Sequence, residues 1–199
     1  MNNKDWDKYH KDITMDLEAD KDMIKFMKRF YRDEKEFKRI LDIGCGQGSN
    51  LAYLSYTYDN FYCHGIDFSS VALCRLNHKL KKRNNILIRQ SNAEKTEFKD
   101  NYFDFVVNIL LFASNNPDKI IKEIHRILVP KGRIFIKELS DNKCNIDNKY
   151  IRRGNEFLKY SEDQLKKLLE NNGFERIEIS KSKIDHQNIE HIISIGRKG

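Results

Sequence analysis

Residues 40–50 read Ile40-Leu41-Asp42-Ile43-Gly44-Cys45-Gly46-Gln47-Gly48-Ser49-Asn50. An apolar strand pattern runs directly into a turn with glycine at three alternate positions, and an apolar helical pattern begins at Leu51. Glycine permits positive φ and lets a ligand approach bare backbone, and the first N–H groups of the following helix face that ligand. Strand, glycine turn and helix in this order therefore predict a site for a nucleotide-like ligand.

The spacing of the glycines narrows the choice of ligand. The turn reads G-x-G-x-G, whereas the dinucleotide fingerprint is G-x-G-x-x-G, whose third glycine would fall at Ser49. Asp42 precedes the first glycine by two positions. The pattern D-x-G-x-G-x-G resembles motif I of the class I S-adenosylmethionine (SAM)-dependent methyltransferases. The alternative is a chance glycine turn in another doubly wound protein.

The length and net charge of the chain limit the number of domains and the kinds of partner that it could have. The chain has 199 residues, enough for one domain with a sizeable core. It carries 37 Lys and Arg against 30 Asp and Glu, a formal charge of +7. Such a surplus could favour nucleic acid, an anionic membrane surface or an acidic substrate. Because acids and bases are interspersed, we interpret the charge as a solvated lysine-rich surface and expect no nucleic-acid partner.

The cysteines and the apolar runs point to a cytoplasmic protein. Cys45, Cys63, Cys74 and Cys144 form no C-x-x-C pair and no zinc spacing, so we expect reduced thiols and no metal. The first residues show no apolar signal-peptide core, and no apolar run approaches the length of a membrane span. We therefore expect neither secretion nor membrane insertion.

Apolar periodicity predicts alternating strands and helices over the first two thirds of the chain. The expected strands are 37–43, 61–66, 86–89, 103–110 and 133–137, and the expected helices are 14–36, 50–58, Ser69 or Ser70 to about 82, and 117–128. This alternation predicts a parallel sheet with helices on both faces. A helix over 162–172 then precedes two strands, 174–184 and 189–197, which are joined too closely for a parallel crossover.

A parallel sheet finished by an antiparallel hairpin resembles the methyltransferase sheet. The fold class implied is α/β, a Rossmann-like doubly wound sheet of seven strands in the order 3-2-1-4-5-7-6, with strand 7 antiparallel. We expect a single domain over 1–199, with 1–36 as an N-terminal helical cap and 37–199 as the cofactor-binding core. Residues 139–160 form a long connection at the carboxyl ends of the strands, and such loops are often functional lids.

The resemblance covers about residue 38 to the C-terminus and implies S-adenosyl-L-methionine as cofactor and S-adenosyl-L-homocysteine as product. Asp67 ends the second strand and should bind both ribose hydroxyls, because a carboxylate accepts hydrogen bonds and donates none. Phe68 should lie against adenine. Asn92 stands where the family usually has an acid, and its amide oxygen could accept from the adenine amino group. The implied cofactor-binding residues are Asp42, Gly44, Cys45, Gly46, Gly48, Asp67, Phe68, Asn92, Ala93 and Asn108.

Other segments match the family without naming the acceptor. Glu123 to Arg133 resembles the segment E-x-x-R-x-L-x-P-G-G, with Lys131 at the first of those glycines, and we treat it as scaffold. The residues after Asn108 lack the N-P-P-Y box of enzymes acting on nucleic-acid bases. Phe112 and Ala113 stand where many small-molecule members carry a histidine. A general base from this strand is therefore in doubt, and the catalytic residue is left open.

Two stretches outside the common scaffold are candidates for the acceptor site. The segment around Trp6, Tyr9 and His10 resembles the start of thiopurine- and tellurite-resistance-type methyltransferases, in which the N-terminus covers the cofactor; a disordered tail is the alternative. Tyr9 and His10 are the candidate catalytic residues. In residues 139–160, arginines could hold a carboxylate or phosphate, and an irregular surface loop is the alternative. The candidate acceptor-binding residues are Trp6, Tyr9, Phe112, Tyr150, Arg152 and Arg153.

These features together predict a SAM-dependent methyltransferase that transfers the sulfonium methyl group to a small-molecule acceptor by in-line displacement. The +7 charge motivates a first alternative, an enzyme that methylates RNA or protein. The missing histidine motivates a second, a non-catalytic SAM-binding protein. A third is an aminopropyl- or nicotinamide-using enzyme on a similar sheet, although the glycine spacing disfavours nicotinamide. The acceptor atom and the oligomeric state stay open.

Overall fold

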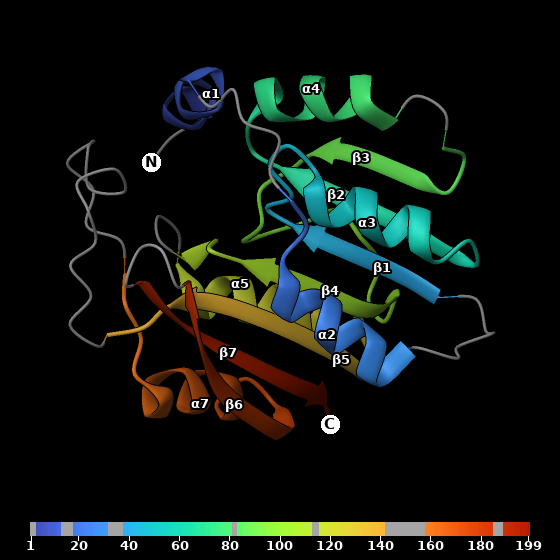
Figure 1. Cartoon of the computed structure of the whole chain (residues 1–199). Helices are drawn as coiled ribbons and strands as arrows, with labels where there is room; N and C mark the ends of the chain where they lie inside the picture. Colours follow the sequence, from blue (N-terminus) through green and yellow to red (C-terminus); the bar gives the residue numbers. More distant parts are fainter. Residues whose placement is uncertain are drawn as a thin grey trace.

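One mixed sheet of seven strands organises the chain, in the order β3-β2-β1-β4-β5-β7-β6 (Figure 1). The computed structural model describes residues 3–12, 18–31, 38–80, 83–112, 116–141, 158–184 and 189–199. Only β7 runs antiparallel to its neighbours, which confirms the predicted fold class and strand order. The strands are β1 (Lys38–Ile43), β2 (Phe61–Asp67), β3 (Ile86–Gln90), β4 (Phe103–Ile109), β5 (Leu128–Leu139), β6 (Phe174–Ile184) and β7 (Ile189–Lys198).

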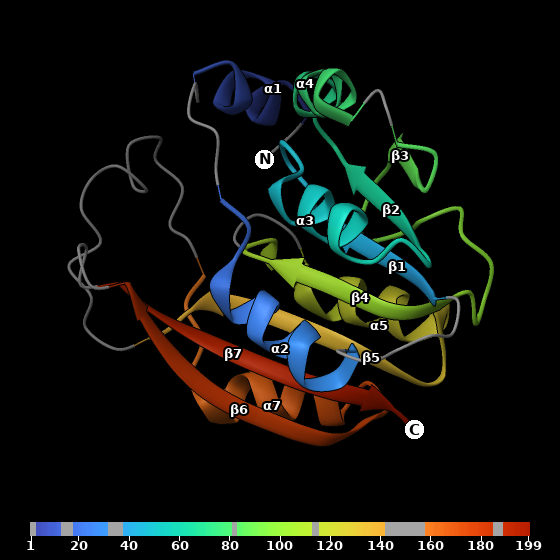
Figure 2. The ribbon, with the colours of Figure 1, turned by 45° about the vertical axis from the view of Figure 1, so that its right-hand side comes forward.

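Helices cover the two faces of the sheet and bury a separate apolar cluster on each. On one face lie α2 (Lys21–Tyr31), α3 (Ser49–Thr57) and α4 (Ser70–Leu80), and on the other lie α5 (Pro117–Ile127) and α7 (Glu162–Glu170) (Figures 1 and 2). The remaining helix, α1 (Asn3–Asp12), lies against α4 in both views and supplies none of its described side chains to either cluster. The core thus holds the sheet together without α1.

The N-terminal region differs from the expected single helix over 14–36. Two helices form instead, and α2 begins only at Lys21 because Asp20 Oδ1 accepts hydrogen bonds from Asp22 N at 2.9 Å and Met23 N at 3.0 Å. An N-cap residue has a non-helical conformation, so a capping aspartate starts the helix at the next residue even where the apolar period extends further toward the N-terminus. The buried Lys137 Nζ binds Asp20 Oδ2 at 2.7 Å and Asp22 Oδ2 at 2.8 Å, which ties the start of α2 to the end of β5.

The strand β5 begins at Leu128, five residues before the expected start at 133. Leu128 pairs with Phe103, and the register shifts before Arg133 pairs with Phe105. Between them Lys131 has φ +67°, a left-handed conformation that L residues adopt at some cost. This explains why glycine stands at that place in the resembling families.

The Glu123–Arg126 pair anchors the segment that follows β3. Glu123 is 8% exposed and accepts from Thr96 N at 2.7 Å and Thr96 Oγ1 at 2.5 Å. Arg126 donates to Glu123 through Nε at 2.9 Å and Nη2 at 2.6 Å, and to Phe98 O at 2.9 Å. One helix turn of α5 therefore fixes the chain between Thr96 and Phe98, a few residues after Asn92 and Ala93.

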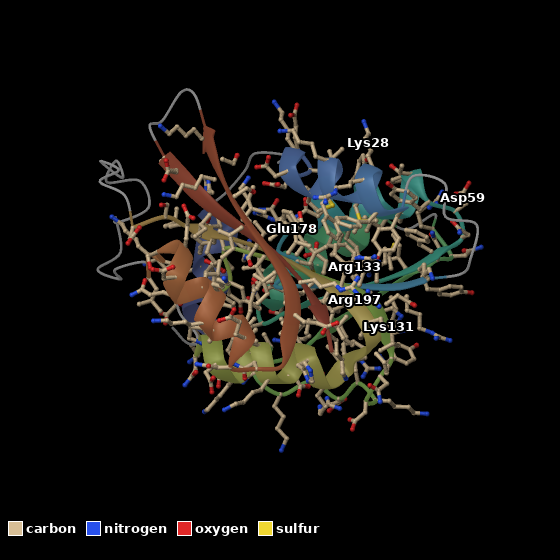
Figure 3. The ribbon with its side chains drawn as sticks, turned by 90° about the horizontal axis from the view of Figure 1, so that it is seen from below. Lys28, Asp59, Lys131, Arg133, Glu178 and Arg197 are labelled. Carbon is tan, nitrogen blue, oxygen red and sulfur yellow. The ribbon has the colours of Figure 1, made fainter. Side chains whose placement is uncertain are left out.

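Several basic groups gather toward the amino ends of the parallel strands, away from the glycine turn. Arg133 on β5 is paired in register with Arg197 on β7, and the view from below shows both (Figure 3). The Arg133 guanidinium lies 4.8 Å from the ring centre of Phe30, and Arg29 forms an ion pair with Glu178 at 2.6 Å. Local ring and carboxylate contacts therefore engage Arg133 and Arg29.

We expect Glu123→Ala to lower the free energy of unfolding by about 3 kcal/mol, because it removes the acceptor of the Thr96 N–H and hydroxyl groups and the carboxylate that pairs with Arg126. The control is Glu97→Ala, which removes an exposed ion pair with Arg89 and should lower it by about 1 kcal/mol or less. Urea unfolding followed by circular dichroism measures both. Equal losses would contradict the anchoring role of Glu123.

Candidate functional site

The glycine turn folds back across the carboxyl end of β2. Gly44 N and Cys45 N both donate to the carbonyl of Ile66, at 2.8 and 2.9 Å. Gly44, Gly46 and Gly48 have φ of +76°, +51° and +80°, which glycine adopts without strain. The backbone conformation of the turn therefore favours glycine at all three positions.

Each glycine also faces a different neighbour. A Cβ at Gly48 would clash with Leu76 of α4, and a Cβ at Gly44 would lie 2.8 Å from Leu111 Cδ1. A Cβ at Gly46 would meet only His10 Cε1, at 3.5 Å. The absence of a side chain at Gly48 and at Gly44 therefore lets Leu76 and Leu111 pack closely against the turn. The expected approach of a ligand to bare backbone applies best at Gly46.

Asp67 lies at the glycine turn, as the predicted ribose-binding role requires. Its Oδ2 accepts from Gly46 N at 2.8 Å, and its Oδ1 accepts from Ser69 N at 2.8 Å. Phe68 follows directly and leaves 39% of its surface exposed. The end of β2 thus presents a carboxylate and an accessible aromatic ring beside the turn.

Asp42 is a buried acid with an unused acceptor. It is 2% exposed, and its Oδ2 has no hydrogen-bond partner among the described residues. Burial, with a further effect from the Asp67 carboxylate, raises the pKa of Asp42 to about 7. A buried carboxylate is costly unless a donor or a cation satisfies it. The unpartnered oxygen therefore fits a ligand that brings such a group.

Cys45 does not have the properties of a nucleophile. Its side chain is buried inside the turn, and burial, followed by Asp42 and Asp67, raises the pKa of its thiol. A thiol with a raised pKa stays protonated at neutral pH, and the thiolate is the reactive form. Cys45 can therefore contribute backbone to the site but not covalent chemistry.

The segment after β3 uses Asn92 in a local turn. Asn92 Oδ1, the atom expected to meet the adenine amino group, accepts from Glu94 N at 2.9 Å. Asn92 is exposed and Ala93 is partly buried. A carbonyl oxygen has two lone pairs, so this hydrogen bond leaves acceptor capacity on Oδ1.

At the carboxyl end of β4, the predicted residues are fully buried. Asn108 pairs in register with Ile43, and both polar atoms of its amide lack partners within the described parts of the chain. Phe112 belongs to the apolar cluster beneath α5, with its ring centre 5.7 Å from that of Tyr160. Asn108 thus offers unpaired polar atoms at the strand end, whereas Phe112 packs in the core.

Helix α1 brings aromatic residues to the glycine turn through His10. His10 is 7% exposed and is the α1 side chain that contacts Gly46. Tyr9 lies 5.2 Å from His10 between ring centres, and Trp6 lies 5.5 Å from Tyr9. Burial lowers the pKa of His10, while the Asp67 carboxylate opposes the shift, so burial favours the neutral imidazole. A neutral imidazole can accept a proton.

Two contacts that the sequence analysis missed hold α1 in place. Asp7 Oδ1 accepts from Ser69 Oγ at 2.6 Å and from Val71 N at 3.2 Å, at the amino end of α4. Arg75 donates to the backbone carbonyls of His10 and Lys11 at the other end of α1. In the sequence, Ser69 and Ser70 mark only the expected start of a helix. They were therefore not expected to bind a distant acid.

Some expectations fall outside the described residues. Tyr150, Arg152 and Arg153 lie in 142–157, so the acceptor-binding role of this loop stays a prediction. Across the described ranges, no group of three or more His, Cys, Asp and Glu side chains is arranged to hold a metal ion. The helices seen in these ranges are all too short or too polar to cross a membrane.

Known proteins share both the sequence pattern and the fold. Residues 41–136 match a family described as methyltransferase domain. Phosphoethanolamine N-methyltransferase of Plasmodium falciparum is 28% identical over 119 residues, which is 58% of this chain and 44% of that enzyme.

Solved structures agree on the fold. Haemonchus contortus phosphoethanolamine N-methyltransferase 2 in complex with S-adenosyl-L-methionine superposes with a TM-score of 0.76 at 17% identity, over 97% of this chain and 56% of that one. A SAM-dependent methyltransferase of Methanosarcina mazei gives 0.68 at 22% identity, over 92% and 99%.

The chain spans less than half the length of the curated P. falciparum enzyme that it matches. The family match includes the glycine turn, Asp67 and the Glu123–Arg126 scaffold, and the strand order is the one that this family implies. Residues 41–136 therefore match a methyltransferase domain, and the chain as a whole has the fold of the S-adenosylmethionine-dependent methyltransferases that it resembles.

Proposed function

We propose that the chain binds S-adenosyl-L-methionine at the glycine turn and transfers its methyl group to a small-molecule acceptor. The observation that carries the proposal is the pair of carboxylates at the turn, Asp67 bonded to Gly46 N and Asp42 with an unpartnered buried oxygen. The names of similar proteins support it: one is a phosphoethanolamine N-methyltransferase, and another was solved with S-adenosyl-L-methionine.

The described residues suit the separate parts of that cofactor. Asp67 would accept from the ribose hydroxyls, and the exposed ring of Phe68 would lie against adenine. Ala93 N–H and Asn92 would meet the edge of the base. Asp42 offers its buried carboxylate to a cationic group, and Asn108 offers an unpaired amide at the end of β4.

When bound, the cofactor supplies a methyl group that its sulfonium has already activated. The protein then needs mainly to align the acceptor and exclude water, and alignment can contribute roughly 7–11 kcal/mol. We assign the cover to α1, whose Trp6, Tyr9 and His10 form one ring cluster that reaches Gly46. His10 is the candidate to accept a proton from an acceptor that needs a base, with Tyr9 beside it.

The acceptor chemistry and the setting of the protein are also part of the proposal. Arg152 and Arg153 would favour an acceptor with a carboxylate or phosphate group. We further propose a single domain over 1–199, with residues 1–36 as its cap, working in the cytoplasm on a small molecule and not on nucleic acid.

The intact protein should bind S-adenosyl-L-methionine and S-adenosyl-L-homocysteine, but not NAD. Asp67→Ala should weaken cofactor binding by roughly 10- to 150-fold, because hydrogen bonds to a charged acceptor contribute about 1.5–3 kcal/mol. The control is Asp59→Ala, an exposed acid paired with Arg83 before the start of β2 (Figure 3). Isothermal calorimetry decides the matter: NAD binding without SAM binding would overturn the proposed function.

Cofactor binding should strengthen with pH in a window set by Asp42. Its pKa is raised to about 7, so acidification protonates it and removes the negative charge offered to a cationic ligand. We expect the affinity for S-adenosyl-L-methionine to rise about tenfold between pH 5.5 and pH 7. Asp42→Asn should bind weakly with a flat profile, and an unchanged slope in this variant would place the titrating group elsewhere.

Deleting residues 1–12 should separate binding from folding. Because α1 supplies no described side chain to either apolar cluster, the midpoint of thermal unfolding should shift by only a few degrees. The affinity for S-adenosyl-L-homocysteine should fall by about tenfold or more, since His10 no longer covers Gly46. Lys8→Ala, an exposed change on α1, serves as the control. Unchanged affinity after the deletion would exclude α1 as the cover.

A further inference from the structure

We propose that Glu138 is a positioning residue of the cofactor site, which holds residues 110–112 (loop 110–112) against the glycine turn. The inference rests on the proposed function only in its last step, where the turn binds S-adenosyl-L-methionine. The anchoring of the loop by Glu138 can be tested without any ligand. The sequence analysis ended the strand at Lys137 and gave Glu138 no role.

Glu138 is a buried acid near the carboxyl end of β5. It is 1% exposed and alternates along the strand with Lys137, whose ammonium binds Asp20 and Asp22 at the start of α2. Successive side chains of a strand point to opposite faces, so Glu138 lies on the face covered by α5 and α7, together with Ile136. The described residues provide no ion-pair partner for Glu138, so its role must come from its hydrogen bonds.

Those hydrogen bonds all reach loop 110–112. Glu138 Oε1 accepts from Leu111 N at 2.9 Å and from Phe112 N at 3.0 Å. The preceding amide, Leu110 N, donates to Lys137 O at 2.8 Å. Two successive residues at the end of β5 therefore accept hydrogen bonds from the three N–H groups that directly follow β4.

The conformation of the loop requires such an anchor. Leu110 has φ +55°, a left-handed conformation that is uncommon for residues other than glycine, asparagine and aspartate. Backbone of this kind persists only where its surroundings hold it, and it gathers at functional sites. An apolar residue at position 138 would remove the acceptor of the buried Phe112 N–H and of the partly buried Leu111 N–H, which explains an acid at this buried position.

The anchoring role of Glu138 depends on a carboxyl oxygen that accepts hydrogen bonds and not on the charge of the group. Burial raises the pKa of Glu138 to about 8, although the hydrogen bonds from Phe112 and Leu111 oppose the shift. Both the neutral and the ionised carboxyl group present an oxygen to the two amides. A glutamine, which has the same shape and one carbonyl oxygen, should therefore replace Glu138 in this role.

The loop carries the effect of Glu138 to the glycine turn through Leu111. A Cβ built at Gly44 would be 2.8 Å from Leu111 Cδ1, so that side chain lies directly on the Gly44 backbone. On the opposite side, Gly44 N is bonded to Ile66 O at 2.8 Å. The turn is thus held between β2 and loop 110–112, and releasing the loop removes one wall of the proposed cofactor site.

The anchor itself is tested by hydrogen exchange of the ligand-free protein. In Glu138→Ala, the amides of Leu111 and Phe112 should exchange at least about tenfold faster than in the unchanged protein, because their acceptor is gone. Glu138→Gln should restore most of the protection. Leu169→Ala, a core truncation on α7, controls for general loss of stability. Retained protection in Glu138→Ala, or the same loss in Glu138→Gln, would overturn the anchor.

The effect on the site is tested by calorimetry with S-adenosyl-L-homocysteine. Glu138→Ala should weaken binding about tenfold or more, while Glu138→Gln and Leu169→Ala stay within about threefold of the unchanged protein. Leu111→Ala, which keeps both backbone hydrogen bonds, should weaken binding and retain the exchange protection, so it tests the contact even if Glu138→Ala does not fold. Unchanged affinity in Leu111→Ala would refute the link to the glycine turn. If the unchanged protein binds no S-adenosyl-L-homocysteine, the proposed function fails and the anchor is judged by exchange alone.

Discussion

The carbonyl of Ile66 accepts hydrogen bonds from two successive amides, those of Gly44 and Cys45, and this contact fixes the turn after β1. Because the chain is pulled across the end of β2, Gly46 N faces Asp67 and α3 can begin at Ser49. The acid at the end of one strand and the glycines at the end of its neighbour thereby become one surface. A parallel pairing of β1 with β2 is the condition for this arrangement.

Elements that are far apart in sequence form the other sides of this surface. His10 of α1 lies on Gly46, and Leu111 from the end of β4 lies on Gly44. Neither contact comes from a residue that recognises a ligand by charge. The glycine turn is therefore bounded by packing on two sides and by a carboxylate on the third, and its shape depends on all three.

The sequence predicted the sheet well because its signals are local and strong. Apolar runs such as 103–109 mark the strands, and the short connection over 185–188 predicts an antiparallel final pair, whereas the strand order was implied by the resemblance to methyltransferases. The predicted start of the N-terminal helix was wrong because the apolar period takes no account of Asp20. The Asp20 carboxylate caps the first turn of α2, so the helix begins at the next residue. The early start of β5 was missed because Pro130, Lys131 and Gly132 are residues typical of a turn. The structure keeps them within the strand, with Lys131 in a left-handed conformation.

The candidate site was predictable only where a motif lies within one segment. Asp42, the glycines and Asp67 follow from β1 and β2, and they lie together at the carboxyl ends of these strands. Asp7 could not be found, because its partners Ser69 and Val71 are more than sixty residues away. Glu138 was equally hidden, since it binds backbone amides and leaves no pattern of residue types.

The attachment of α1 has an evolutionary consequence. Asp7 and Arg75 join the helix to α4 through polar contacts, and none of the described side chains of α1 belongs to either apolar cluster. Substitutions on α1 that spare these two contacts meet little selection from folding. A lineage can therefore exchange the aromatic residues beside the glycine turn while the scaffold beneath stays the same.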